Sequence, residues 1–226
     1  MIKKIILRFI GKDYYYKVEQ LRKRGAEIGD IRISGDITID NNWPFLLHIG
    51  NNTHLTNNVT ILCHDFSWSV VKGYDGTLMG GVKPVYIGDN VFIGNGAIIL
   101  MGTRIEDNTI VAAGSVCTGK YPPNSVIAGT PAKVICTLDE YKKKRQARQL
   151  SEVTEIVRRY RRCYNTNPPK DLIAASSYLF EPRQEPLYPA LIKRMKLKGN
   201  YEKSKEAFMN SKPMFKSYED FLDSIK

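Results

Sequence analysis

The stretch that decides the fold is VYIGDNVFIGNGAIILMGTRIEDNTIVAAGSVCTGK, residues 85–120, which repeats every six residues. An earlier block, GDIRISGDITIDNNWPFLLHIGNNTHLTNNVTILCH at residues 29–64, keeps the same period. The third position of the hexad is aliphatic in ten of twelve cases. This position holds Ile31, Ile37, Trp43, Ile49, Leu55 and Ile61 in the earlier block, and Ile87, Ile93, Ile99, Ile105, Val111 and Cys117 in the later one.

A period of six is unlike either regular secondary structure. An α-helix would spread the aliphatic positions around its circumference, so the pattern is not helical. Short strands joined by tight turns fit instead, with one aliphatic side chain per hexad pointing inward. Three hexads close a triangular coil of a parallel β-helix, and twelve predict four coils. Residues eighteen apart then stack: Ile31 on Ile49, Ile37 on Leu55, Ile87 on Ile105, and Ile93 on Val111.

Glycine and asparagine occur at the ends of several hexads, in IGDN, IGNG and IGNN. Both residue types adopt the backbone conformations that tight corners need. These segments are therefore the predicted corners of the coils.

The hexads resemble those of the hexapeptide-repeat acyltransferases, whose fold is a left-handed parallel β-helix. The end of the later block, IVAAGSVCTGKYPPNSVIAGTPAKVI at residues 110–135, resembles the last coil of the galactoside, maltose and capsular-polysaccharide O-acetyltransferases. The resemblance covers residues 29–136. It predicts a mainly β fold: a left-handed β-helix of four or five coils with an extended loop, an N-terminal helical segment and a helical C-terminal extension.

The repeat stops immediately after His64 and resumes at Val85. The intervening loop 65–84, DFSWSVVKGYDGTLMGGVKP, is rich in glycine and aromatic residues, and long loops in compact domains are often binding loops. In the resembled enzymes, a histidine at this place deprotonates the acceptor hydroxyl. Neutral imidazole, with an unperturbed pKa near about 6.5, suits that task. We therefore predict that His64 is the general base.

Two neighbours of His64 have alternative interpretations. Asp65 could orient the imidazole, although adjacent residues on a strand point apart; its carboxylate could instead form an Asx-type turn that opens the loop. Cys63 could form an acyl-enzyme, but nothing in the sequence indicates a lowered thiol pKa, and a packed thiol is the other interpretation. His48 and His54 fall at outward-facing positions on different faces, so we predict no metal site.

The resemblance also implies positions for acetyl-CoA, the expected co-substrate. Asn95 and Ala113 match residues along the pantetheine arm, and Thr118 and Lys133 match the region of the nucleotide end. Lys120 could contribute there, but it lies one place from the usual lysine of the family. Each could instead be a solvated corner residue. The acids that contact the sugar in the galactoside and maltose enzymes have no clear match in NNWPFLLHIG.

The charge of the chain, +11 in total, is concentrated in its flanks. Residues 1–28, a predicted helical segment, carry +5; residues 29–128 carry −3; residues 129–226 carry +9. Residues 137–226 are predicted to form the helical extension. Basic flanks fit solvated helix faces, phosphate-bearing ligands, nucleic acid or an anionic membrane surface. With the enzymatic interpretation we expect no nucleic-acid partner, and peripheral membrane contact stays open.

Several observations favour the cytoplasm. The four cysteines show no CxxC spacing, which suits reduced thiols. No signal peptide is recognisable at the N-terminus, and no stretch reaches about 18 apolar residues.

The resulting prediction is a homotrimeric acetyl-CoA-dependent O-acetyltransferase that acts on a sugar of a surface polysaccharide or its precursor. Two alternatives stay open. One is N-acetylation of an amino sugar nucleotide, in which a histidine base would serve equally well. The other is a non-catalytic β-helix scaffold or binding protein.

Overall fold

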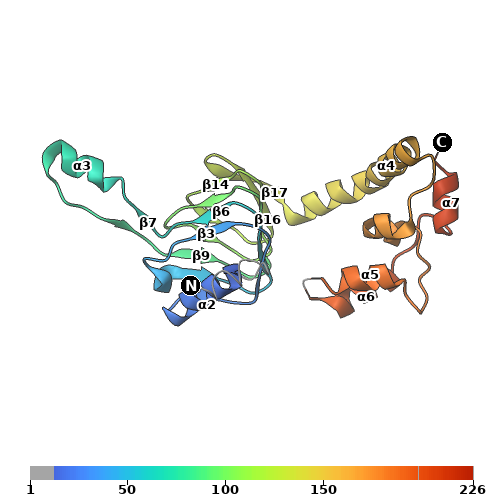
Figure 1. Ribbon diagram of the computed structural model, residues 1–226, viewed down its shortest axis with the longest axis horizontal. Helices are drawn as coiled ribbons and strands as arrows, with labels where there is room; N and C mark the ends of the chain where they lie inside the picture. Colours follow the sequence, from blue (N-terminus) through green and yellow to red (C-terminus); the bar gives the residue numbers. More distant parts are fainter. Residues whose placement is uncertain (1–12, 198, 226) are drawn as a thin grey trace. The chain divides into compact units, whose positions relative to one another are not determined.

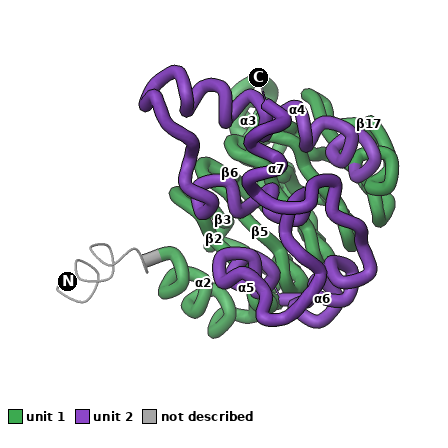
Figure 2. Tube along the Cα trace, turned by 90° about the vertical axis from the view of Figure 1, so that its right-hand side faces the viewer, with its two compact units in different colours: residues 1–141 green, residues 142–226 purple. Residues whose placement is uncertain are grey.

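The computed structural model describes residues 13–197 and 199–225, in two compact units that divide between Tyr141 and Lys142 (Figure 2). The first unit is a left-handed parallel β-helix, as the resemblance to the hexapeptide-repeat acyltransferases implies. Helix α2 (Asp13–Lys23) precedes its first strand. The rest of the predicted N-terminal helical segment, residues 1–12, lies outside the described residues.

Three sheets form the sides of the β-helix, and we call them face A, face B and face C (Figure 1). Face A contains β1 (Glu27–Ile28), β4 (Leu47–Ile49), β9 (Val85–Ile87), β12 (Arg104–Ile105) and β15 (Lys120–Tyr121). Face B contains β2 (Ile31–Ile33), β5 (Thr53–Leu55), β10 (Phe92–Ile93), β13 (Ile110–Val111), β16 (Ser125–Gly129) and the antiparallel β17 (Ala132–Thr137). Face C contains β3 (Ile37–Ile39), β6 (Val59–Ile61), β11 (Ile98–Ile99) and β14 (Val116–Cys117). The chain visits the faces in the order A, B, C, so the face-A strands begin five successive coils.

The predicted stacking is right for the later block and wrong for the earlier one. Ile87 pairs with Ile105, and Ile93 pairs with Val111. In the earlier block, Ile31 pairs with Thr53 rather than Ile49, and Ile37 pairs with Val59 rather than Leu55.

The reason for this error is the hexad NNWPFL, which does not form a side of the coil. It contains a 3₁₀ helix, η1 (Pro44–Leu46), that lengthens one corner. The missing side of the first coil is β1, which begins at Glu27, two residues before the first predicted hexad.

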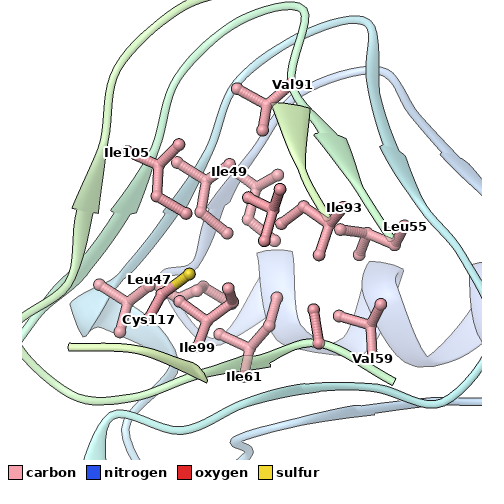
Figure 3. Packing of buried hydrophobic residues seen from close by; sticks show 14 of the residues in the cluster. Leu47, Ile49, Leu55, Val59, Ile61, Val91, Ile93, Ile99, Ile105 and Cys117 are labelled. Carbon is pink, nitrogen blue, oxygen red and sulfur yellow. The ribbon is translucent and has the colours of Figure 1, made fainter. Parts of the chain in front are cut away.

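The core of the β-helix is the column of third-position side chains (Figure 3). Each is fully buried from Ile49 onward, and burial of one such side chain stabilises the fold by about 1.5–3 kcal/mol. Trp43, the residue at this position in the inserted corner, is 39% exposed. The stacked residues are Ile49, Leu55, Ile61, Ile87, Ile93, Ile99, Ile105, Val111 and Cys117.

Stacked asparagines form the corners between faces A and B. All four have positive φ, a conformation that asparagine tolerates better than most residues. The side-chain amides of the first three donate to the amide oxygen of the asparagine in the next coil, at 2.9, 2.8 and 3.0 Å. The members of this ladder are Asn52, Asn90, Asn108 and Asn124.

The corner between faces B and C, which we call the B–C edge, is constant in length. Matching outward-facing residues on these faces are always six apart: Arg32 and Thr38, His54 and Thr60, Phe92 and Ile98, Ile110 and Val116.

The corner between faces C and A, which we call the C–A edge, varies. The sequence separation between matching outward-facing residues on faces C and A differs from coil to coil. It is ten residues from Thr38 to His48, twenty-six from Thr60 to Tyr86, six from Ile98 to Arg104 and four from Val116 to Lys120. The insertions of the first unit are therefore concentrated at one edge.

The largest insertion at the C–A edge is an arm formed by residues 64–82. Strand β7 (His64–Asp65) pairs with β8 (Gly81–Val82) in antiparallel fashion, and helix α3 (Trp68–Asp75) lies at the end that projects from the coils (Figure 1). No residue of α3 is buried. The predicted loop 65–84 is thus mostly an ordered arm.

The second unit is helical. Its elements are α4 (Leu138–Tyr164), which begins in the first unit, η2 (Lys170–Leu179), α5 (Pro189–Met195), α6 (Tyr201–Met209) and α7 (Tyr218–Asp223). Val153 and Val157 of α4 pack with Phe180 and Phe221 in one small core. Within the described chain, no helix combines the length and the apolar character that crossing a membrane requires.

Candidate active site

The candidate site lies at the C–A edge, where the arm leaves the second coil. His64 is the first residue of β7, and Asp40 occupies the same edge one coil earlier, immediately after β3. The backbone N–H of Asp40 donates to the carbonyl of Ile61 at 2.9 Å, which ties the two coils together beside the site. The imidazole Nδ1 of His64 lies 2.5 Å from Oδ2 of Asp40.

Asp40 is a buried carboxylate with well-defined donors. Its side chain is 1% exposed, whereas that of His64 is 29% exposed. Oδ2 also accepts from the backbone N–H of Cys63 at 2.9 Å, and Oδ1 accepts from that of Asn42 at 2.9 Å. Burial alone would raise the pKa of Asp40, but the hydrogen bonds from His64, Asn42 and Cys63 outweigh it. The pKa therefore lies below its ordinary value, and Asp40 is ionised at neutral pH.

This geometry fixes what the imidazole can do. An ionised carboxylate can only accept hydrogen bonds, so Nδ1 of His64 must carry the proton that it donates to Asp40. In the neutral ring, Nε2 then has a free lone pair. His64 is partly exposed, so this nitrogen can serve as a base toward an external hydroxyl or amine.

Asp65 forms the Asx-type turn that was the second interpretation of its role, and it does not bond the imidazole. Its Oδ1 accepts from the backbone N–H of Ser67 at 2.7 Å, and its Oδ2 accepts from Ser67 Oγ at 2.6 Å. These two bonds lower the pKa of Asp65. This is the Asx-type turn at the start of the arm, and the carboxylate that bonds the imidazole belongs to Asp40.

Cys63 is fully buried, and its thiol is unsuited to nucleophilic attack. Burial, with a smaller contribution from the charge of Asp40, raises the pKa of the thiol to about 11. Of the two interpretations of Cys63, the geometry therefore favours a packed thiol over an acyl-enzyme.

Asn95 and Ala113 lie together at the B–C edge, between faces B and C of the third and fourth coils. The carbonyl of Asn95 accepts from the N–H of Gly114 at 2.9 Å, and both predicted side chains are exposed. His64 is at the opposite edge of face C. One chain therefore presents the candidate base and the candidate arm-binding residues on two separate edges.

The other three predicted cofactor residues do not join this pair. Thr118 is exposed at the C–A edge of the fourth coil. Lys133 is exposed on β17, opposite Ala128 of β16 on face B. Lys120 is exposed on face A, in register with Arg104.

Among the described residues, no group of three or more His, Cys, Asp or Glu side chains is placed to hold a metal ion. His48 lies on face A and His54 on face B, as their hexad positions predict. His48 bonds Glu27 at 2.8 Å, and His54 bonds Ser34 at 2.8 Å.

Sequence reasoning missed Asp40, which lies 24 residues before His64. Regular stacking gives no reason to join them, because the inserted corner of residues 40–46 shifts the register between the two coils. The usable signal is the place of Asp40, which follows a face-C strand as His64 does.

Comparisons with known proteins agree with this architecture. The sequence model of the family "Bacterial transferase hexapeptide (six repeats)" matches residues 84–119. Protein CapG of Staphylococcus aureus is 36% identical over 146 residues, which cover 63% of this chain and 83% of CapG.

Two further similarities are more partial. A 2,3,4,5-tetrahydropyridine-2,6-dicarboxylate N-acetyltransferase of Alkaliphilus metalliredigens (strain QYMF) is 39% identical over 99 residues, 44% of this chain but 38% of that protein. The crystal structure of a maltose O-acetyltransferase from Clostridium difficile 630 matches with 30% identity and a TM-score of 0.44, over 55% of this chain and 76% of that one.

Proposed function

The chain belongs to the hexapeptide-repeat family of bacterial acetyltransferases, and from that premise we propose that it transfers the acetyl group of acetyl-CoA to a sugar hydroxyl. The acceptor in this proposal is a surface polysaccharide, such as capsule, exopolysaccharide or lipopolysaccharide, or its precursor. The resemblance of residues 110–135 to the last coil of the galactoside, maltose and capsular-polysaccharide O-acetyltransferases supports a saccharide acceptor.

The observation that carries the proposal is the pair formed by His64 and the buried Asp40 at the root of the arm. Nε2 of His64 takes the proton of the acceptor hydroxyl as its oxygen bonds to the thioester carbon. The imidazolium, stabilised by ionised Asp40, then returns the proton to the sulfur as the carbon–sulfur bond breaks. The products are the acetylated acceptor and free CoA. We assign the orienting role to Asp40 and not to Asp65.

We place the pantetheine arm of acetyl-CoA along Asn95 and Ala113, and the nucleotide end near Lys133 and near Thr118, which lies at the same edge as His64. Because Asn95 and His64 lie at opposite edges of face C, a complete site would take its base from one copy of the chain and its arm-binding residues from another. A closed homotrimer meets this requirement three times.

Acetyl transfer is tested by measuring thiol release from acetyl-CoA with a panel of sugars, nucleotide sugars and oligosaccharides. Free CoA should also raise the melting temperature, because a ligand that binds the folded state stabilises it. Absence of a thermal shift at millimolar CoA, together with no thiol release above the background hydrolysis, would contradict the proposal.

The shared site is tested by mixing two inactive variants. His64→Ala and Ala113→Tyr, the latter meant to block the cofactor arm, should each be inactive alone. Co-expressed in equal amounts, they should recover about a quarter of wild-type activity, the fraction of interfaces with two intact halves in a random mixture. Recovery no greater than that of separately purified variants mixed without exchange would place each site within one chain.

The alternative of N-acetylation has one specific observation in its favour, the similarity to the N-acetyltransferase noted above. His64 would take a proton from an amine acceptor in the same way. Matched acceptors that differ only in an amino or a hydroxyl group decide between them. The scaffold alternative is set aside, because the chain belongs to a family of enzymes.

The second unit supports a further part of the proposal, peripheral contact with an anionic membrane. Residues 142–226 contain twenty basic and ten acidic residues, whereas residues 1–141 contain fourteen and thirteen. Basic residues near such a surface each contribute about 1 kcal/mol of attraction. The full chain should therefore sediment with vesicles of phosphatidylcholine and phosphatidylglycerol at low salt, and not with phosphatidylcholine alone.

A further inference from the structure

Face A of the β-helix carries a continuous ladder of outward-facing side chains, one for each coil. The strand register stacks them in the order Glu27, His48, Tyr86, Arg104 and Lys120. The pattern is absent from the corresponding positions of face C, which hold Thr38, Thr60, Ile98 and Val116. Face A is therefore more polar, more aromatic and more cationic than face C.

Contacts along the ladder hold its side chains in place. Glu27 Oε2 lies 2.8 Å from His48 Nδ1. The His48 ring stacks on Tyr86 with centroids 4.5 Å apart and an interplanar angle of 8°. The guanidinium of Arg104 covers the other face of Tyr86 at 3.9 Å from the ring centroid, and Arg104 Nε lies 2.5 Å from Glu106 Oε1. The ladder is thus preorganised before any ligand arrives.

A hollow of about 390 Å³ runs beside this ladder toward the C–A edge, the edge that carries His64. Phe45, which is 62% exposed, lines one part of it, and Lys83 and Pro84 line another. Lys83 is joined to the candidate site, since its backbone N–H donates to the carbonyl of Cys63 at 3.0 Å. One backbone hydrogen bond therefore connects the lining of the hollow to the residue that precedes the candidate base.

The charges of the hollow are unequal. Its described lining includes the cations Lys83, Arg104 and Lys120, and one acidic residue, Glu27, which bonds His48. Lys83 and Lys120 are exposed. Cations on a preformed surface favour carboxylate or phosphate groups, and exposed apolar side chains such as Phe45 can cover the apolar faces of sugar rings.

We propose that this hollow on face A binds an acidic segment of the acceptor glycan, next to the sugar that His64 deprotonates. The inference rests on the proposed acetyl transfer, and it narrows the acceptor to a chain with uronic or other acidic sugars. The ladder runs along successive coils, so it matches an extended oligosaccharide rather than one sugar. It also gives Lys120 a role on face A, away from Asn95 and Ala113 at the B–C edge.

The test uses two oligosaccharides of equal length, an acidic oligogalacturonide and a neutral maltooligosaccharide, titrated onto the full chain by calorimetry. We expect the acidic probe to bind in a salt-sensitive manner and the neutral probe to bind more weakly. The double variant with Lys83→Ala and Lys120→Ala should bind the acidic probe with an affinity lower by about tenfold or more. The matched control is Arg32→Ala, which removes an exposed cation from face B and should leave the affinity unchanged.

Three results would overturn the inference: no binding of the acidic probe, equal losses in the control, or a raised KM for acetyl-CoA in the lysine variant with unchanged probe binding. The last result would make the hollow a site for the nucleotide end. Thiol release with the best acceptor separates the two hypotheses. If the lysine variant keeps both acetyl transfer and probe affinity, the proposed glycan-binding role of the hollow is wrong. The proposed acetyltransferase function is then unaffected. If lysine-dependent probe binding occurs in a chain that transfers no acetyl group, the proposed function is wrong.

Discussion

The B–C edge and the C–A edge border the same face of the same β-helix, yet they follow opposite rules. The B–C edge uses six residues in each of its four passages, whereas the C–A edge uses from four to twenty-six. The core between them is continuous, since an inward apolar residue lies on every side of the complete coils. An insertion at a corner lengthens a surface connection without moving the buried column, so its cost is small.

The difference between the two edges indicates that the B–C edge suits cofactor binding and the C–A edge suits the catalytic base. A constant edge presents the same backbone at every coil, which suits a long, uniform ligand such as the arm of acetyl-CoA. A variable edge can bring together residues that the repeat would separate, and here it brings Asp40 to His64. Substitutions at the two edges should therefore change different kinetic constants.

The largest effect is expected at the variable edge. His64→Ala should lower kcat by about 10²–10⁴-fold, because the acceptor hydroxyl loses its base. The KM for acetyl-CoA should change little, and the melting temperature should stay close to that of the wild type because the side chain is partly exposed. Turnover within a factor of two of the wild type, measured by thiol release, would remove His64 from the mechanism.

The second largest effect is expected when the hydrogen bond between Asp40 and His64 is altered. Asp40→Asn should lower kcat by about 10²-fold, because a misplaced base costs that much, while the KM for acetyl-CoA stays the same. An asparagine amide can donate as well as accept, so it no longer fixes the proton of His64 on Nδ1. A loss of turnover no larger than the loss of folded protein, measured by circular dichroism, would mean that Asp40 acts only on folding.

A smaller effect is expected at the constant edge. Ala113→Leu adds bulk at an exposed position, and it should raise the KM for acetyl-CoA by about tenfold, the equivalent of about 1.4 kcal/mol. The KM for the acceptor should stay unchanged. The control is Ala112→Leu, one residue away from the proposed arm contact. If both variants behave alike, the arm does not follow this edge.

The two edges also explain how far sequence alone could go. The constant edge and the column of aliphatic residues keep the period of six, so the fold class and the later stacking were predictable from residues such as Ile87 and Ile105. The period is lost where the C–A edge is longer or shorter than six residues. There the stacking of Ile31 was wrongly predicted, because nothing in NNWPFL marks it as an insertion rather than a hexad.

The candidate site was only half predictable for the same reason. His64 is marked by the break in the repeat that follows it. Asp40 has no such mark, because its contact with His64 depends on a register that the inserted corner sets. Asp65 lies beside the base in the sequence and was one interpretation of the partner, but its oxygens bond Ser67.

Acid denaturation offers a thermodynamic view of the variable edge. The folded-state pKa of Asp40 lies below its ordinary value of about 3.9. The ionised group therefore stabilises the fold above that pH, and the contribution is lost as the pH falls through the lower, folded-state pKa. The melting temperature of the wild type should exceed that of Asp40→Asn by about 2–4 °C near neutral pH, and the gap should close as the pH falls through the folded-state pKa of Asp40. A gap that persists in acid would mean that packing, not charge, makes the difference.

The smallest effect separates the two aspartates that flank the base. Asp65→Ala removes a solvated turn at the start of the arm, so kcat should fall by less than about twofold, the range of an exposed hydrogen bond of 0.5 kcal/mol or less. Asp65→Asn, which can still accept from the N–H of Ser67, should be closer still to the wild type. The comparison with Asp40→Asn is the decisive one, since both changes replace a carboxylate within one hydrogen-bonded neighbourhood. If Asp65→Ala lost as much turnover as Asp40→Asn, the arm and its turn, rather than the buried pair, would determine how the base is oriented.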